Sequence, residues 1–357
     1  MQGLISYAYA YARSKAIESN LLTMEKYENL ISSQDIQQII NQLLETNYRE
    51  FISFFSTKYS GTDLIEVSLN SALVRISRVA LNITPRIGLD ALRAYISKWD
   101  INNIKIILSS KIIGKPVKET ETFLISERDM PAGLFAGMLM PEDYRLMVEE
   151  NDIESIIKYL LKFPYGKVLV EGLEAYRKNG DIGEMLIQLE LFYFKNLKEK
   201  VKIFLGNELP FLHLIASQID SKNIMTLIRG IELGIPPMDL RNYLIEGGYL
   251  TKSRLDDLSQ TTSVDEIVEK IKDFYDLTKA LEKFHINHDL KEFEIMLEKY
   301  IVEKNITSFR LSSPGLSSII GMLLMYETER ENIRKISYGK YYGLSQDTIR
   351  SMLIRVI

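Results

Sequence analysis

The chain of 357 residues contains no cysteine. This absence excludes disulfide bonds, thiolate nucleophiles and cysteine-ligated zinc, and it fits an intracellular protein. An excess of one charge is also missing, because 44 basic and 48 acidic residues give a formal net charge of −4. General nucleic-acid binders carry a basic excess, so we expect no nucleic acid as a partner.

Long apolar runs are absent as well. The longest weakly polar stretches, residues 130–141 and 315–326, are shorter than the ~20 residues that a membrane-spanning helix needs. The first 22 residues lack the continuous apolar segment of a secretory signal. We therefore expect the chain to reach a membrane only through a partner.

Motifs for catalysis or metal binding are scarce. Of the three histidines, His285 and His288 form a His-x-x-His pair without the glutamate of a zinc protease motif, and His213 follows an apolar segment. Each of the three Gly-Lys pairs lacks the earlier glycine and the following Ser or Thr of a phosphate-binding loop. The sequence thus predicts no catalytic residue, no metal and no cofactor, and hence a protein that is not an enzyme.

Helical periodicity dominates what is present. Apolar residues recur every three or four positions in 35–44, 153–161 and 264–271. No segment shows the two-residue alternation of a strand bounded by hairpin turns. The predicted fold class is therefore all-α.

Three segments of the chain align with one another without a gap. In each, an acidic residue lies three before an Asn-Ile pair, a Gly lies eleven after the Asn, and a Leu-Ile pair begins ten after the Gly. At residue frequencies of roughly 5–10%, such agreement does not arise by chance. The aligned residues are Asp100, Asn103, Ile104 and Gly114; Asp220, Asn223, Ile224 and Gly234; and Glu329, Asn332, Ile333 and Gly343.

A second element precedes the first two copies. It consists of two tyrosines on either side of an Asp-Ile pair, with identical spacings in both copies. Its residues are Tyr27, Asp35 and Tyr48 in the first copy and Tyr144, Asp152 and Tyr165 in the second. The third copy keeps the helical pattern over residues 250–277 but not these residues. The sequence therefore predicts three homologous helical domains, at residues 1–130, 131–250 and 251–357.

Each Asn-to-Gly segment is typical of a helix that stops sharply. The glycine suits the left-handed position that ends a helix, and Pro116, Pro236-Pro237 and Ser345 suit the start of a second helix. Two interpretations of the acid and the Asn remain open and are compatible. Either these side chains satisfy backbone groups and pair locally at a helix junction, or the three clusters line a shared surface.

These motifs resemble those of the C subunit of the archaeal and bacterial V-type (A-type) ATP synthases, a family related to the d subunit of eukaryotic V-ATPases. The resemblance covers the whole chain. It rests on Tyr9 to Arg13 with Leu21-Leu22, on Asp100 to Lys105, and on the closing element from Asn332 to Arg350. One departure is the family's Arg-Gly-Lys triplet, which here is Ser-Ser-Lys, Arg-Gly-Ile and Tyr-Gly-Lys in the three copies.

The resemblance implies a funnel of three helical domains about a pseudo-threefold axis. One side would sit on the proteolipid rotor ring, and the other would receive the central shaft subunit with its small companion subunit. The chain would carry torque between ion transport and ATP synthesis or hydrolysis, as a peripheral protein on the cytoplasmic face of the cell membrane. Candidate partner contacts are Lys105, Arg229, Arg334 and Lys335.

A generic helical-repeat adaptor is the alternative to this rotor subunit. Open solenoids have polar capping repeats, whereas the third copy reaches Ile357 without one. That ending favours repeats that close on one another.

Overall fold

The computed structural model describes residues 2–115, 139–204 and 208–354. Every regular element in this part of the chain is a helix and no strand occurs in it, which confirms the predicted all-α class. Among the described helices, none combines the length and the apolarity that crossing a membrane would require.

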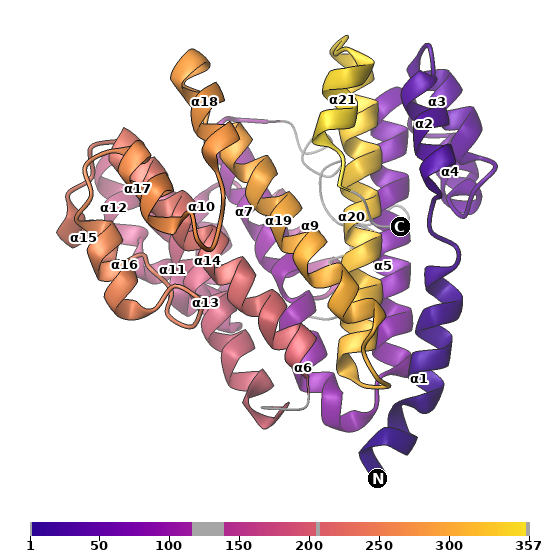
Figure 1. The fold of residues 1–357 in the computed structure, drawn as a ribbon, viewed down its shortest axis with the longest axis horizontal. Helices are drawn as coiled ribbons and strands as arrows, with labels where there is room; N and C mark the ends of the chain where they lie inside the picture. The colour runs from indigo at the N-terminus through magenta and orange to yellow at the C-terminus, as the bar shows by residue number, and fades with distance from the viewer. Residues whose placement is uncertain (1, 116–138, 205–207, 355–357) are drawn as a thin grey trace. The chain divides into compact units, whose positions relative to one another are not determined.

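The first described part of the chain is residues 2–115 (Figure 1). Its helices are α1 (Gln2–Glu18), α2 (Met24–Ser32), α3 (Ile36–Leu43), α4 (Arg49–Phe55), α5 (Gly61–Ile83), α6 (Arg86–Ile96) and α7 (Lys98–Ile112). The next part contains α9 (Pro141–Glu149), α10 (Ile153–Leu160), α11 (Pro164–Glu171), α12 (Leu173–Asn179), α13 (Gly183–Val201) and the short 3-10 helix η1 (Lys202–Phe204).

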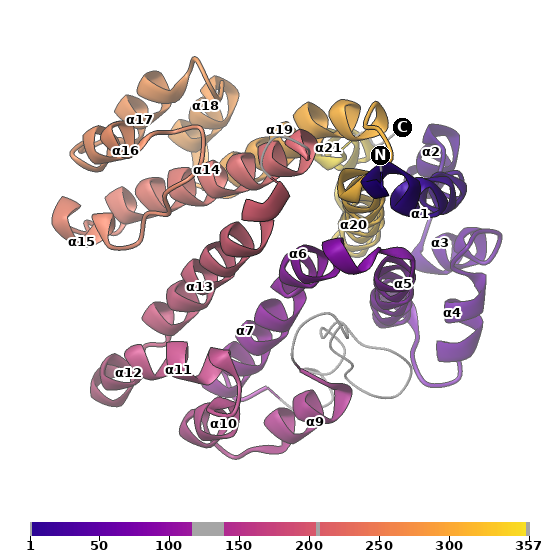
Figure 2. The same cartoon turned by 90° about the horizontal axis from the view of Figure 1, so that it is seen from below.

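The remaining helices follow residue 208. They are α14 (Leu209–Glu232), α15 (Pro237–Arg241), α16 (Lys252–Ser259), α17 (Val264–Ile271), α18 (Thr278–Asn287), α19 (Lys291–Arg310), α20 (Leu316–Tyr341) and α21 (Gln346–Met352). Figure 2 shows the same helices along a perpendicular direction.

The three predicted amphipathic helices are confirmed as α3, α10 and α17. Each begins after an N-cap residue, Asp35, Asp152 or Ser263, whose side chain accepts a hydrogen bond from the backbone N–H three positions later. Their apolar faces are buried, as the three- and four-residue spacing requires.

The predicted helix stops are confirmed at all three glycines. Helices α7, α14 and α20, called the motif helices below, end before Gly114, Gly234 and Gly343, whose φ angles are 64°, 65° and 70°. In each, the residue after the glycine donates its N–H to the carbonyl five positions back, at 2.8–3.0 Å, which is a Schellman motif. Helix α15 then begins at Pro237 and α21 is capped by Ser345, while the predicted start at Pro116 lies outside the described residues.

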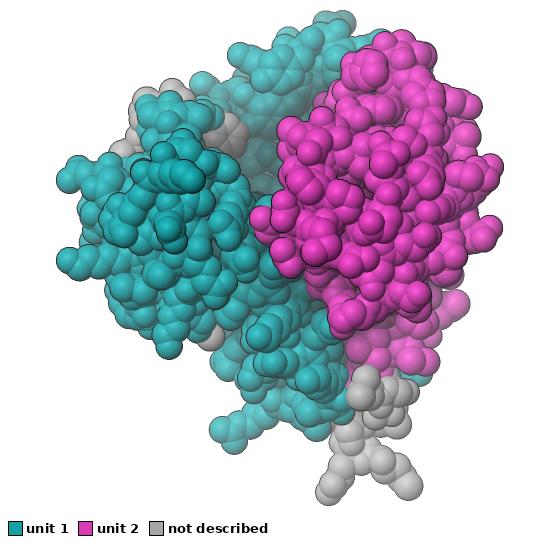
Figure 3. Space-filling model, turned by 90° about the vertical axis from the view of Figure 1, so that its left-hand side faces the viewer, with its two compact units in different colours: residues 1–203, 313–357 teal, residues 204–312 magenta. Residues whose placement is uncertain are grey.

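The structure divides into two compact units, which Figure 3 distinguishes by colour. Unit 1 comprises residues 1–203 and 313–357, and unit 2 comprises residues 204–312. Unit 2 is one continuous segment, whereas unit 1 needs both ends of the chain.

In unit 1, the first helices of the chain pack against the last ones. One hydrophobic cluster joins residues between Leu22 and Ala72 with Ile333, Ile336 and Ile349. Helices α5 and α20 lie side by side in this part (Figures 1 and 2). Elsewhere in unit 1, α11 packs on α13, which in turn contacts α6 and α7. Helices α10 and α12 contact α11, and α9 contacts α7.

Unit 2 has its own core. Its residues run from Ile224 on α14 to Leu297 on α19, and they include apolar side chains of α16, α17 and α18. The predicted domain limit at 250 lies inside this core, since Leu250 is one of its members. The limit at 130 lies outside the described residues, so the division into three domains stays a prediction.

Candidate functional site: an acid held by short helices

The repeated acidic residue is buried in all three copies. Asp100 and Asp220 are fully buried and Glu329 is 1% exposed. Each acid lies on a motif helix and faces a group of three short helices, called the short-helix set below. The sets are α9–α11 for Asp100, α16–α18 for Asp220 and α2–α4 for Glu329. A buried carboxylate needs hydrogen-bond donors, and the short-helix sets supply them.

In the first copy, two tyrosines hold the acid. The hydroxyl of Tyr144 donates to Asp100 Oδ1 at 2.5 Å, and the hydroxyl of Tyr165 donates to Asp100 Oδ2 at 2.9 Å. Burial, and after it the charge of Asp100, raises the pKa of both hydroxyls well above the ordinary value. Both tyrosines therefore remain protonated donors.

The second copy combines one tyrosine with backbone donors. Tyr275 donates its hydroxyl proton to Asp220 Oδ2 at 2.9 Å, and the N–H groups of Tyr249 and Leu250 donate to the same carboxylate at 2.9 and 3.1 Å. Burial raises the pKa of Asp220, while these hydrogen bonds act in the opposite direction.

The third copy ties the two ends of unit 1 together. The N–H of Leu22 donates to Glu329 Oε2 at 2.5 Å across a sequence separation of 307 residues. Tyr48 donates its hydroxyl proton to Glu329 Oε1 at 2.8 Å. Burial is the largest influence on the Glu329 carboxyl and raises its pKa to about 7. The acid of the last copy is thus held by helices from the start of the chain.

The structure shows a leucine position that the alignment of the second element did not include. A buried leucine lies 13 residues before each N-cap residue, at Leu22, Leu139 and Leu250. Two of these leucines donate their N–H to the acid, as described above. The third copy escaped the sequence comparison because Tyr275 lies 12 rather than 13 residues after Ser263. The equal spacing of these three leucines can be recognised from the sequence alone.

The repeated Asn joins its motif helix to the segment after the turn. Asn223 donates from Nδ2 to the carbonyl of Ile245 at 2.8 Å and accepts the N–H of Ile245 at 2.8 Å. Asn332 makes the same pair of bonds with Ile354, at 2.7 and 3.0 Å. The equivalent of these isoleucines in the first copy, Ile125, lies outside the described residues. In two copies, therefore, the Asn satisfies backbone groups at the end of the helical hairpin.

In the second and third copies, the middle residue of the triplet (Arg-Gly-Ile and Tyr-Gly-Lys) has to be small. A Cβ built on Gly230 would lie 2.2 Å from Leu240 Cδ2, and one on Gly339 would lie 2.7 Å from Ile349 Cγ1. Leu240 and Ile349 are buried residues of α15 and α21. The glycines therefore allow the second helix of the hairpin to pack closely on the first.

The predicted partner contacts carry intramolecular ion pairs. Lys105, Arg229 and Arg334 have carboxylate partners, and their side chains are 28–52% exposed. The pairs are Lys105 with Glu190 at 2.5 Å, Arg229 with Glu294, and Arg334 with Glu66 at 2.7 Å and with Glu331 at 2.9 Å. Lys335 is half-buried on α20. Contact with a partner stays a prediction for all four.

Two of these predicted contacts line one groove in unit 1. The groove has a volume of about 510 Å³ and lies between α7 and α20. Lys105 and Arg334 line it together with apolar side chains such as Trp99 and Ile113. The lining combines cationic, apolar and neutral polar side chains with one acid, Glu331, which suits a protein segment with mixed chemistry.

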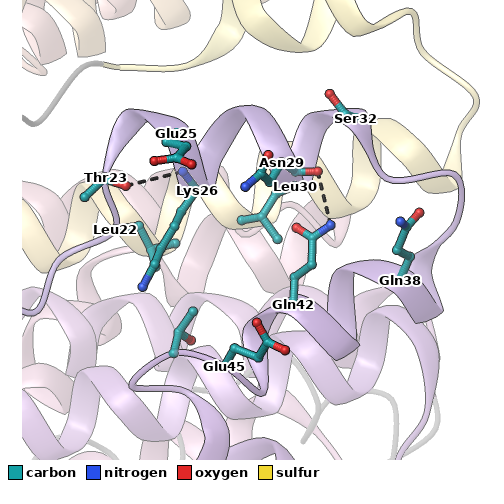
Figure 4. Close-up of a pocket in the computed structure, with 11 residues that line it drawn as sticks. Leu22, Thr23, Glu25, Lys26, Asn29, Leu30, Ser32, Gln38, Gln42 and Glu45 are labelled. Atoms are coloured by element: carbon teal, nitrogen blue, oxygen red, sulfur yellow. Dashed lines mark hydrogen bonds between the residues drawn. The ribbon is translucent and has the colours of Figure 1, made fainter.

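A second groove, of about 650 Å³, lies between α2 and α3 (Figure 4). Amides and hydroxyls dominate its lining, and its charged residues are Glu25, Lys26 and Glu45. Gln42 reaches across it and donates to the carbonyl of Asn29 at 3.3 Å.

The histidines occupy separate positions. His213 lies against the ring of Tyr249, His285 pairs with Asp265 at 2.9 Å, and His288 ends α18 with a positive φ of 53°. Within the described ranges, no group of three or more His, Asp or Glu side chains is placed to hold a metal ion.

Comparison with known proteins identifies relatives over nearly the whole chain. The model of the ATP synthase (C/AC39) subunit family matches residues 10–352. The chain is 34% identical over 349 residues to a Thermoplasma volcanium protein named as the C subunit of an A-type ATP synthase, with 98% of each chain covered. Proteins of the same name from Thermoplasma acidophilum and Methanocaldococcus jannaschii are 33% and 25% identical, over 98% of this chain. These alignments cover 98% and 87% of the two relatives.

Proposed function

Because the chain belongs to the ATP synthase (C/AC39) subunit family, we propose that it is a non-catalytic subunit of the central rotor of an A-type rotary ATPase. In this role it caps the proteolipid ring and holds the central shaft with its small companion subunit. It transmits torque between ion transport in the ring and ATP synthesis or hydrolysis elsewhere in the complex. It lies on the cytoplasmic face of the membrane and reaches the membrane only through the ring.

The observation that carries this proposal is the buried acid of each copy. A part that transmits torque must resist shearing of its helices, and each acid ties a short-helix set to a motif helix by two or more hydrogen bonds. Hydrogen bonds to a buried charged group contribute about 1.5–3 kcal/mol each and fix geometry as well as stability. The repeated motif therefore supports a rigid coupling element. The proposed threefold arrangement of the copies about the shaft would use this rigidity.

The groove between α7 and α20 is the surface that we propose for binding the shaft. It brings Lys105 and Arg334, two predicted partner contacts, onto one surface with Trp99 and Ile106. A helix of the shaft with acidic and apolar side chains would match this lining.

The absence of cysteine permits a direct test. Ser109 lines the groove, so a photo-crosslinker attached through Ser109→Cys reports on what occupies it. In membranes solubilised after illumination, we expect an adduct with the shaft protein and co-purification of the ring and the catalytic subunits. The matched control is Thr57→Cys, an exposed position after α4 that is not part of this groove.

Two results would contradict the proposal. Recovery of the chain free of every other ATP synthase component would leave the generic adaptor as the better interpretation. Equal shaft adducts from both cysteine positions would remove the groove from the proposal.

A further inference from the structure

A largely buried ion pair lies where the lining of the groove between α7 and α20 begins on both helices. The ammonium of Lys98, the first residue of α7, lies 2.6 Å from Glu327 Oε2 on α20, and the two side chains are 20% and 11% exposed. Tyr95, which is fully buried on α6, donates its hydroxyl proton to the same oxygen at 3.0 Å. Trp99 and Arg330, which line the groove, lie one residue after Lys98 and three residues after Glu327. Tyr95, Lys98 and Glu327 are called the clasp below.

Aromatic rings surround the ammonium of the clasp. Lys98 Nζ lies 3.8 Å from the centre of the Tyr95 ring and 5.2 Å from that of the Trp99 ring. Burial lowers the pKa of Lys98, and the charge of Glu327 acts in the opposite direction. The ammonium therefore depends on this carboxylate for its counter-charge, while the rings restrict where the ammonium can lie.

A second charged cluster ties α20 to α5. Arg330 and Arg334 on α20 each pair with Glu66 on α5, at 3.1 and 2.7 Å, and each also pairs with Glu331. Asn70, fully buried on α5, accepts two further hydrogen bonds from Arg330, at 2.9 and 2.6 Å. Because these contacts do not involve the clasp, α20 keeps its place on α5 whether or not the clasp is intact.

The other wall of the groove is held differently. Helix α6 contacts both α7 and α20 (Figure 2), and polar side chains join the first turn of α7 to α20. These are Lys98 with Glu327, and Trp99, whose ring lies 5.8 Å from the guanidinium of Arg330. The distance between the two walls therefore depends on the clasp, since it is the ion pair that bridges them at this end.

Stability alone does not account for a charged pair at this place. Desolvation of two charges offsets much of their attraction, and apolar residues of similar volume often pack two helices equally well. An ion pair with a third hydrogen-bond partner differs from an apolar contact in its preference for one separation and one orientation. The clasp therefore suits two helices that must keep a defined spacing.

We propose that the clasp sets the distance between α7 and α20 and thereby positions the two walls of the groove for the shaft, an inference that rests on the proposed rotor function. With α7 tied to α20 and α20 tied to α5, a force on either wall passes to the helices behind both. Tyr95, Lys98 and Glu327 act as positioning residues, because the described lining of the groove includes none of the three.

The test compares two variants that each replace an ion pair and its tyrosine by apolar residues. The clasp variant carries Tyr95→Phe, Lys98→Met and Glu327→Leu, so that no hydroxyl is left buried without its acceptor.

The matched control carries Tyr11→Phe, Lys15→Met and Glu18→Leu on α1. Lys15 lies 2.8 Å from Glu18 and 5.7 Å from the centre of the Tyr11 ring, and the two charged side chains are 28% and 12% exposed. The control thus removes a pair of similar length, exposure and surroundings that does not bridge the groove.

Three quantities are measured on each full-length chain. Because the chain has no cysteine, Ser109→Cys on α7 and Lys335→Cys on α20 accept spin labels, and double electron–electron resonance gives the distribution of distances between them. Urea denaturation gives the stability, and titration with the purified shaft protein gives the affinity of the unlabelled chains.

We expect a broader distance distribution in the clasp variant than in the unchanged chain, and no broadening in the control. The urea midpoints of all three proteins should lie close together, because apolar residues take over the packing. The clasp variant should bind the shaft about tenfold more weakly, since a site that is not pre-organised loses affinity, and the control should stay within about twofold. If the clasp variant does not fold, Tyr95→Phe alone should broaden the distribution and weaken shaft binding about twofold to threefold.

Three results overturn the inference. These are an unchanged distance distribution in the clasp variant or in Tyr95→Phe, equal broadening in the control, and unchanged shaft affinity in spite of broadening. An unchanged chain that does not bind the shaft would instead overturn the proposed rotor function. The label distances would still decide in that case whether the clasp sets the spacing of α7 and α20.

Discussion

At the scale of the residue, Glu329 makes the stability of the contact between the two ends of the chain depend on pH. Its ordinary pKa of 4.5 rises to about 7 in the folded chain because the carboxyl is buried. A carboxyl with a raised folded-state pKa binds its proton more tightly in the folded state than in the unfolded state. Its contribution to stability is therefore complete below pH 4.5 and is lost as the pH rises through about 7.

Glu329→Gln removes this pH dependence because the amide stays neutral. Relative to the unchanged chain, we expect the variant to gain about 3 kcal/mol in the free energy of unfolding between about pH 5 and pH 8. Urea denaturation at a series of pH values measures the difference. Glu45→Gln, at an exposed residue of the same part of unit 1, is the control and should show no such trend. Parallel pH profiles of Glu329→Gln and the unchanged chain would contradict the expected role of this carboxyl.

At the scale of the element, the helical hairpin needs glycine for two different reasons. Gly234 has a φ of 65° with open space around a built Cβ, so its requirement is conformational. Gly230 lies inside α14 under Leu240, so its requirement is close packing. The hairpin thus combines one backbone requirement and one packing requirement four residues apart.

A double-mutant cycle separates these two requirements. Gly230→Ala should cost about 1–3 kcal/mol through overpacking, and most of that cost should disappear in a Leu240→Ala background. Gly234→Ala should cost about 1 kcal/mol in both backgrounds because its cause is the left-handed backbone. Denaturant unfolding measures all six proteins. Additive effects of Gly230→Ala and Leu240→Ala would show that the close contact between these two residues is not what requires the glycine.

At the scale of the whole molecule, the two units depend on the chain in different ways. Unit 2 holds its acid, its short-helix set and its core within residues 204–312. Unit 1 places Ile333, Ile336 and Ile349 from the end of the chain in the core of α2–α5. The first helices therefore need the last ones, although α6 to α19 lie between them in the sequence.

A chain ending after residue 312 tests this dependence. We expect α2–α4 to lose protection against amide hydrogen exchange, since their apolar faces and the donors of Leu22 and Tyr48 lose their partners. The segment 209–310 should keep its protection because its core is complete. Hydrogen exchange followed by mass spectrometry reads both segments in the same sample. Native-like protection of α2–α4 in the shortened chain would refute the closure of unit 1 described above.

Much of this protein was readable from the sequence alone. The amphipathic helices over 35–44, 153–161 and 264–271 and the stops at the three glycines followed from spacing along the chain, and the family followed from the resemblance of its motifs. Such signals are local, because a helix face repeats every three to four residues and a left-handed turn is set by a single glycine.

Only the tertiary structure decided which short-helix set packs on which motif helix. Nothing in the spacing indicates that Glu329 accepts the N–H of Leu22, 307 residues away. The leucine spacing is visible in the sequence, but its role is not, because the donor is a backbone N–H, which every residue except proline carries. The sequence by itself determined the three copies of the motif, whereas burial of apolar faces decided that the last copy is completed by the start of the chain.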